Sequence, residues 1–184
     1  MEITQPILFY TIGYPGSGKT TFAISFSKDS NAEHLYADKL GIQIFQTPRY
    51  SQEERKHVLE EMDWLALTNL QGNVGVVYDA NINSFSEREH LRDIAKKANT
   101  VAVGIWIKTP ISIAKRRLSE IRRIGNVNIR QMTDKNRANN EFKKIVNRFE
   151  APRSSEMTLM ISGIDPYDQQ LKEIGKSLRN IQVK

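Results

Sequence analysis

The stretch from Ile7 to Thr21, which reads ILFYTIGYPGSGKTT, constrains the fold of this chain more than any other part of the sequence. Its first six residues are apolar, β-branched or aromatic, which is typical of a buried strand. The next eight residues match the pattern G-x-x-x-x-G-K-[ST], a loop whose backbone N–H groups curl around a phosphate. A strand that leads through this loop into a helix near Lys19 predicts a phosphate-binding site at the N-terminus of that helix.

This loop predicts that the chain binds ATP together with Mg²⁺. We expect the Lys19 ammonium to reach the β- and γ-phosphates and the Thr20 hydroxyl to bind the metal. The residues expected to hold the nucleotide phosphates are Gly13, Tyr14, Pro15, Gly16, Ser17, Gly18, Lys19, Thr20 and Thr21.

Length and composition set the class of protein. A chain of 184 residues is expected to form a single domain, residues 1–184, with a real core. The absence of cysteine excludes disulfides, thiolate chemistry and cysteine metal sites. No apolar run approaches the roughly 20 residues of a membrane helix, and the N-terminus lacks signal-peptide features. We therefore expect a cytoplasmic protein with no membrane partner.

Apolar segments alternate with helical patterns along the whole chain. Ser51 with Glu54, and Ser86 with Glu89, have the spacing of a capping box, and Pro110 suits the first turn of a helix. This alternation predicts an α/β fold, a five-stranded parallel sheet with helices on both faces, which binds ligands at the carboxyl ends of its strands. Besides the first strand, we expect strands near 34–37, 74–78, 101–107 and 157–162. We expect helices near 19–28, 51–70 and 86–98, an arginine-bearing helix from Pro110, and helices near 133–149 and beyond 165.

Two aspartates follow predicted strands at the end where ligands bind. A carboxylate in this position is unfavourable unless it binds something. Asp79, after the third strand, suits a Mg²⁺ site, either directly or through water. Asp38, after the second strand, suits a general base that accepts the proton of an attacking hydroxyl. The structural alternative for each is an aspartate that caps a helix or a turn.

Charge is distributed unevenly along the chain. Residues 1–107 carry a net charge of −3, whereas residues 108–153 carry +9. A basic stretch beside a phosphate loop suits a polyanionic ligand, although a solvated helix face is the alternative for many of the lysines. The arginines that stand out in this stretch are Arg116, Arg117, Arg122 and Arg123.

Four segments together resemble a known family. They are TIGYPGSGKTT, YAD ending at Asp38, VVYDANIN over 76–83, and the arginine-rich helix after Thr109-Pro110. Over roughly residues 5–150 the chain resembles the 5′-polynucleotide kinase-like branch of P-loop kinases, which includes bacteriophage polynucleotide kinases and has zeta-toxin-like relatives. The resemblance implies the P-loop NTPase fold and an arginine-rich lid near residues 115–135.

The resemblance also implies roles for individual residues. Lys19 and Thr20 would bind phosphates and metal, and Asp38 would be the general base, with Asp79 and Asn81 beside the active centre. Arg117 and either Arg122 or Arg123 would clamp the transferred phosphate. The chain departs from the family at Gly41, where phage enzymes carry an arginine that contacts the acceptor.

These observations favour an ATP-dependent kinase that phosphorylates a hydroxyl, preferably the 5′-hydroxyl of a nucleic acid or nucleotide. One alternative is a small-molecule or sugar-nucleotide kinase of the zeta-toxin or antibiotic-phosphotransferase type. The other is a non-catalytic nucleotide-binding switch, which would need no general base.

The histidines and tryptophans suggest no chemistry. The histidines have no recognisable partner pattern and are interpreted as surface or packing residues. The tryptophans stand in apolar surroundings and are expected in the core. These residues are His34, His57, His90, Trp64 and Trp106.

Overall fold

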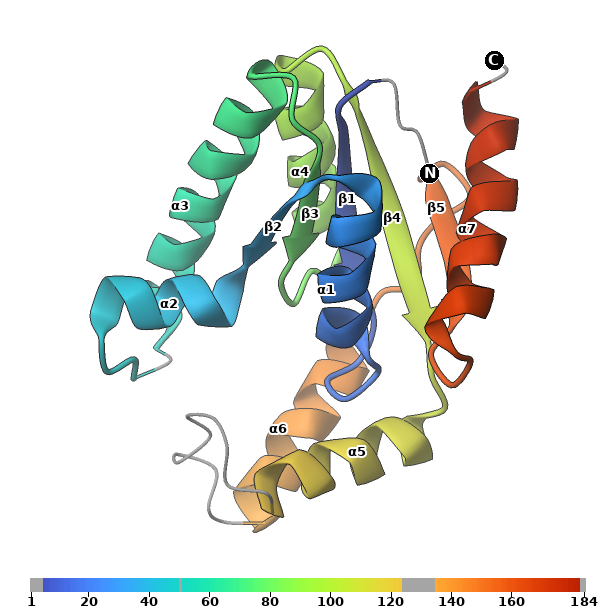
Figure 1. Cartoon of the computed structure of the whole chain (residues 1–184). Helices are drawn as coiled ribbons and strands as arrows, with labels where there is room; N and C mark the ends of the chain where they lie inside the picture. The colour runs from blue at the N-terminus through green and yellow to red at the C-terminus, as the bar shows by residue number, and fades with distance from the viewer. Residues whose placement is uncertain (1–4, 50, 124–134, 183–184) are drawn as a thin grey trace.

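A five-stranded parallel sheet forms the centre of the protein, as seen in the computed structural model, which describes residues 5–49, 51–123 and 135–182 (Figure 1). The strand order is β2-β3-β1-β4-β5, and every neighbouring pair is parallel. The strands are β1 (Ile7–Ile12), β2 (Glu33–Tyr36), β3 (Val76–Asp79), β4 (Val101–Lys108) and β5 (Thr158–Ser162). The predicted fold class is confirmed.

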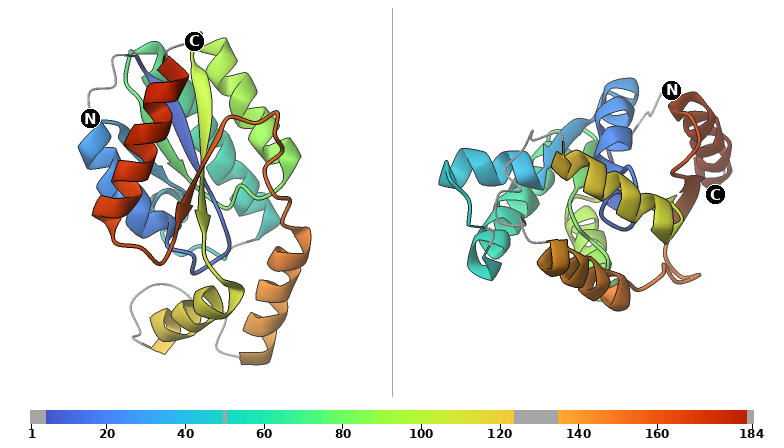
Figure 2. Two further views of the ribbon diagram at one scale, coloured as in Figure 1. Left: turned by 90° about the vertical axis from the view of Figure 1, so that its right-hand side faces the viewer. Right: turned by 90° about the horizontal axis from the view of Figure 1, so that it is seen from below.

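Seven helices accompany the strands in the described part of the chain. They are α1 (Lys19–Ser30), α2 (Ala37–Phe45), α3 (Gln52–Gln71), α4 (Phe85–Lys97), α5 (Ile111–Arg123), α6 (Lys135–Arg148) and α7 (Tyr167–Gln182). Helices α5 and α6 lie together below the sheet, at the carboxyl ends of its strands (Figures 1 and 2). No helix among the described residues is long and apolar enough to cross a membrane.

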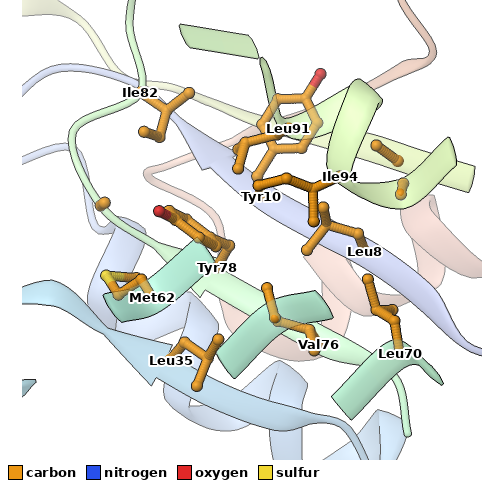
Figure 3. Packing of buried hydrophobic residues seen from close by; sticks show 14 of the residues in the cluster. Leu8, Tyr10, Leu35, Met62, Leu70, Val76, Tyr78, Ile82, Leu91 and Ile94 are labelled. Carbon is orange, nitrogen blue, oxygen red and sulfur yellow. The ribbon is translucent and has the colours of Figure 1, made fainter. Parts of the chain in front are cut away.

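The sheet has a hydrophobic core on each face. On one face, Leu8 and Tyr10 of β1 pack with residues of α3 and α4 such as Met62 and Leu91 (Figure 3). On the other face, Phe9 lies in a second cluster with residues of α1 and α7. Alternating side chains of β1 therefore enter opposite cores, which explains why this strand is apolar throughout.

The start of α4 differs from the sequence prediction. Ser84 is the capping residue: its hydroxyl accepts from the Glu87 backbone N–H, and the Glu87 carboxylate accepts from the backbone N–H of Ser84. The predicted box of Ser86 with Glu89 was wrong, whereas that of Ser51 with Glu54 at α3 is confirmed. Both serines near α4 have a glutamate three residues later, but the Glu87 carboxylate also pairs with Arg55 of α3, which favours the earlier start.

Two further features were not predicted. Helix α2 follows β2 directly, and a Cβ on its Gly41 would lie 3.6 Å from Cγ2 of Val58, on the side of α2 that packs on α3.

Trp64 is 59% exposed rather than buried, so its assignment to the core was wrong. Its neighbours one turn away on α3, Glu60 and Thr68, are exposed too, which shows that Trp64 lies on the outer side of this helix. Trp106 is partly buried against the first core.

Candidate active site

The phosphate loop joins β1 to α1 and depends on two glycines. Gly16 has a φ of +81°, and a Cβ there would collide with the carbonyl of Ala114 in α5. Gly18, with a φ of +102°, is the N-cap of α1. Side chains rarely adopt such left-handed conformations, so glycine is required for this close approach of loop, helix and α5.

The Lys19 side chain folds back and binds carbonyl groups of the phosphate loop. Its ammonium donates to the carbonyls of Gly13 at 2.9 Å and Tyr14 at 3.1 Å. Burial lowers the pKa of Lys19 to about 8, against the opposing influence of the Asp79 and Asp38 carboxylates. No described carboxylate forms an ion pair with this ammonium, so a desolvated cation is held in the loop without an anion. This arrangement fits an anionic phosphate.

Asp79 ends β3 with its carboxylate almost fully buried. The Thr11 hydroxyl donates to its Oδ1 at 3.2 Å, and Nε2 of His34 lies 3.3 Å from its Oδ2. His34 was therefore misjudged as a histidine without a partner. The pairing of strands is the signal that could have indicated the contact between His34 and Asp79. The partly buried His34 lies on β2, which pairs with β3, the strand that ends at Asp79.

Asp38 lies in the first turn of α2, with its side chain exposed. The Tyr36 hydroxyl donates to Asp38 Oδ2 at 3.1 Å. Surrounding protein atoms raise the pKa of Asp38, and the nearby Asp79 charge acts in the same direction, while the Tyr36 hydrogen bond and Lys19 oppose the rise. Asp38, Asp79 and Lys19 thus share one electrostatic environment at the carboxyl edge of the sheet.

One of the highlighted arginines reaches the phosphate loop. Nη1 of Arg117 donates to the carbonyl of Gly163 at 2.8 Å and lies 3.8 Å from where a Cβ on Gly18 would be. Arg116 instead approaches Glu120 at 3.8 Å on the exposed side of α5. Arg122 and Arg123 end α5, and their side chains lie outside the part of the chain that the structure describes.

Asn83 is a site residue whose role the sequence did not reveal. It is buried, and its Oδ1 accepts from the Gly13 N–H at the entrance of the phosphate loop at 3.3 Å. Its carbonyl accepts from the backbone N–H of Glu150, which lies just after α6. Asn81, by contrast, is exposed, and its carbonyl accepts from Arg55.

A metal would need ligands beyond the described side chains. No group of three or more His, Cys, Asp or Glu residues among them is placed to hold an ion. Thr20 follows Lys19 at the start of α1, and both oxygens of Asp79 have protein partners. This donor set fits Mg²⁺ only when phosphate oxygens and water complete its coordination, which is common for this hard cation.

Comparisons with known proteins place the chain in a family. Residues 8–152 match the AAA domain family AAA_33. Over 132 residues the chain is 26% identical to the L-seryl-tRNA(Sec) kinase of Methanococcus maripaludis, a match that covers 70% of this chain and 52% of that protein. The chain therefore spans about half the length of this curated relative.

Solved structures show the same fold. A putative kinase from Chloroflexus aurantiacus aligns with a TM-score of 0.73 at 14% identity, covering 97% of this chain and 99% of the other. A gluconokinase from Sinorhizobium meliloti aligns with a TM-score of 0.67 at 15% identity, covering 98% and 95%. Because the family match spans more than half of its length, the chain belongs to the AAA_33 family.

Proposed function

We propose that this protein is an ATP-dependent kinase that transfers the γ-phosphate to a hydroxyl of a nucleic acid or nucleotide, with the 5′-hydroxyl as the favoured acceptor. The observation that carries the proposal is the exposed carboxylate of Asp38 beside the buried Lys19 ammonium, at the edge of the sheet that α5 and α6 cover. A base open to solvent next to a phosphate cradle is the arrangement that phosphoryl transfer to an external hydroxyl requires.

The residues of the phosphate loop bind and orient the nucleotide. Backbone N–H groups of the loop donate to phosphate oxygens, apart from Gly13, whose N–H donates to Asn83, and Pro15, which has none. Lys19 leaves its two carbonyl partners to bind the β- and γ-phosphates. Thr20 would hold Mg²⁺, and Asp79 would hold it directly or through water. When bound, the metal would neutralise charge on the phosphates.

Asp38 accepts the proton of the acceptor hydroxyl while the hydroxyl oxygen attacks the γ-phosphorus. The new oxygen–phosphorus bond forms as the bond to the β-phosphate oxygen breaks, and ADP leaves with that oxygen. Arg117, with Arg122 or Arg123 as a second clamp, neutralises the charge that spreads over the transferred group. Positioning and charge neutralisation are the main demands of this chemistry.

Two observations support a polyanionic acceptor. The net charge of +9 over residues 108–153 belongs to the stretch that forms α5 and α6 at the site. The relative from Methanococcus is named as a kinase of seryl-tRNA, an acceptor hydroxyl carried by a nucleic acid. That this relative is named as a kinase also favours an enzyme over the nucleotide-binding switch.

Gly41 favours a second candidate, a small-molecule or sugar-nucleotide kinase. This position lies on the side of α2 that packs on Val58, so α2 offers no basic contact there for an acceptor phosphate. Such a kinase would keep Asp38 as base and bind its acceptor without the basic stretch.

The two candidates are separated by following the labelled γ-phosphate of ATP. The acceptors are a 5′-hydroxyl oligonucleotide, the same oligonucleotide with a 5′-phosphate, a nucleoside and a panel of sugars. We expect label on the 5′-hydroxyl oligonucleotide and none on its phosphorylated twin. Label on a sugar alone would establish the small-molecule kinase instead.

A further inference from the structure

We propose that Tyr36 is a positioning residue that holds the Asp38 carboxylate by Oδ2 and leaves Oδ1 to receive the proton of the acceptor hydroxyl. This inference rests on the proposed role of Asp38 as general base. Tyr36 is the last residue of β2 and the N-cap of α2, so its ring stands where the sheet passes into the helix that carries Asp38.

The hydrogen bond is well suited to this task. The Tyr36 hydroxyl lies 3.1 Å from Oδ2 of Asp38, and no described residue donates to Oδ1. Asp38 is exposed, so packing alone does not fix its carboxylate. A hydroxyl donor to an ionised oxygen forms one of the stronger hydrogen bonds in proteins, and a single such bond orients the carboxylate.

A second ring keeps Tyr36 in place. The rings of His34 and Tyr36 lie parallel, with centroids 5.7 Å apart and an interplanar angle of 4°. The two residues are two apart on β2 and therefore project from the same face of the sheet. Nε2 of His34 contacts Oδ2 of Asp79, so each stacked ring contacts a different carboxylate of the site. The pair thereby fixes both carboxylates relative to each other.

The electrostatics agree with this geometry. Burial, with the charge of Asp38, raises the pKa of Tyr36, against the opposing influence of a hydrogen bond with Thr20. The Tyr36 hydrogen bond in turn opposes the rise in the pKa of Asp38 that the surrounding protein and Asp79 cause, while Lys19 acts in the same direction as Tyr36. Tyr36 thus favours the ionised form of Asp38, which is the form that accepts a proton.

The test is a double-mutant cycle of Tyr36→Phe and Asp38→Asn. Phenylalanine keeps the ring on His34 and removes only the hydroxyl. Transfer of labelled phosphate from ATP to a 5′-hydroxyl oligonucleotide, or to the best acceptor of the panel above, gives kcat and both KM values. Tyr167→Phe is the matched control, because its hydroxyl also donates to an aspartate, Asp29, which lies near the C-terminal end of α1.

We expect Tyr36→Phe to lower kcat about tenfold or more with the KM for ATP unchanged, as for loss of a hydrogen bond to a charged group. In the Asp38→Asn background, Tyr36→Phe should lower kcat no further, because Tyr36 acts through Asp38. An equal loss in both backgrounds, or a rate for Tyr36→Phe like that of Tyr167→Phe, would overturn the inference. A normal rate for Asp38→Asn would instead overturn the proposed base and the inference with it.

A crystal structure of Tyr36→Phe gives a readout independent of turnover. We expect the Asp38 carboxylate to occupy more than one orientation when the hydroxyl is gone. A single orientation identical to that of the unsubstituted protein would show that Tyr36 does not position it.

Discussion

Lys19 places a positively charged group inside the phosphate loop. Its ammonium is buried against two carbonyls, and burial lowers its pKa to about 8. Phosphate oxygens favour the charged form, so nucleotide binding must raise this pKa. Near pH 8 roughly half of the free protein carries neutral Lys19, and binding should take up about half a proton.

Calorimetric titration of ATP with Mg²⁺ near pH 8, in buffers of different ionisation enthalpy, measures this uptake. The observed heat should depend on the buffer for the unsubstituted protein. In Lys19→Ala, affinity should fall and the protonation attributable to this residue should disappear. A buffer-independent heat in the unsubstituted protein would contradict the proposed contact between Lys19 and phosphate.

Asp38→Asn should remove most phosphoryl transfer and leave ATP binding nearly intact. The amide keeps the shape of the side chain but accepts no proton, and a general base contributes about 10²–10⁴-fold to the rate. Single-turnover transfer and ATP affinity are measured on the same variant. Transfer within a few-fold of the normal rate would leave Asp38 as a structural residue.

Arg117→Lys should lower kcat, whereas Arg116→Lys one position earlier should not. Lysine retains the charge but loses the planar fork that grips two phosphate oxygens. Arg117 reaches the loop at Gly18, while Arg116 points toward Glu120 in solvent, so the two variants are matched in chemistry and differ in place. Equal rates for both would indicate that α5 presents only a solvated face.

At the scale of elements, a buried ion pair joins α4 to the chain before β5. Nε of Arg88 lies 2.7 Å from Oε2 of Glu156, and Nη2 lies 3.0 Å from Oε1, with both side chains fully buried. Nη1 of Arg88 also donates to the carbonyl of Glu150, which follows α6. Burial acts to raise the pKa of Glu156, but its hydrogen bonds to Arg88 hold it below the ordinary value.

Glu156→Gln should therefore destabilise the protein strongly, by about 3–5 kcal/mol, because it leaves the Arg88 charge buried without its partner. Glu60→Gln, which breaks the exposed pair with Lys56 on α3, should cost about 1 kcal/mol or less. Urea unfolding at neutral pH compares the two variants. Equal midpoints would show that the buried pair contributes nothing beyond a surface pair.

The sequence predicted elements better than contacts between them. The phosphate loop, the strands and the capping box at Ser51 follow from local patterns, and the structure confirms them. The contacts of His34 with Asp79 and of Asn83 with Gly13 were not predicted, because these partners lie 45 and 70 residues apart and meet only through the pairing of strands. Helix α2 was not predicted, because it begins directly at the end of β2 and no loop residues mark its start in the sequence.

For the whole molecule, the order of strands decides what the site contains. Because β1 lies between β3 and β4, the end of β1 contacts Asp79, and the loop after β1 contacts Asn83 on one side and α5 on the other. Parallel strands bring all these ends to one edge, as the alternating pattern predicts. The same edge carries α5 and α6, which belong to the basic stretch of residues 108–153.

The central claim is that this basic edge binds a polynucleotide acceptor, and its most direct test is the acceptor KM across a salt series at saturating ATP. Each phosphate neutralised by the protein should contribute a slope of about 0.7 on single strands and about 0.9 on duplex, in log KM against log salt. We predict a steep rise of the acceptor KM with salt and little change in the KM for ATP. A flat acceptor response would contradict the account and leave a kinase for a small, uncharged acceptor.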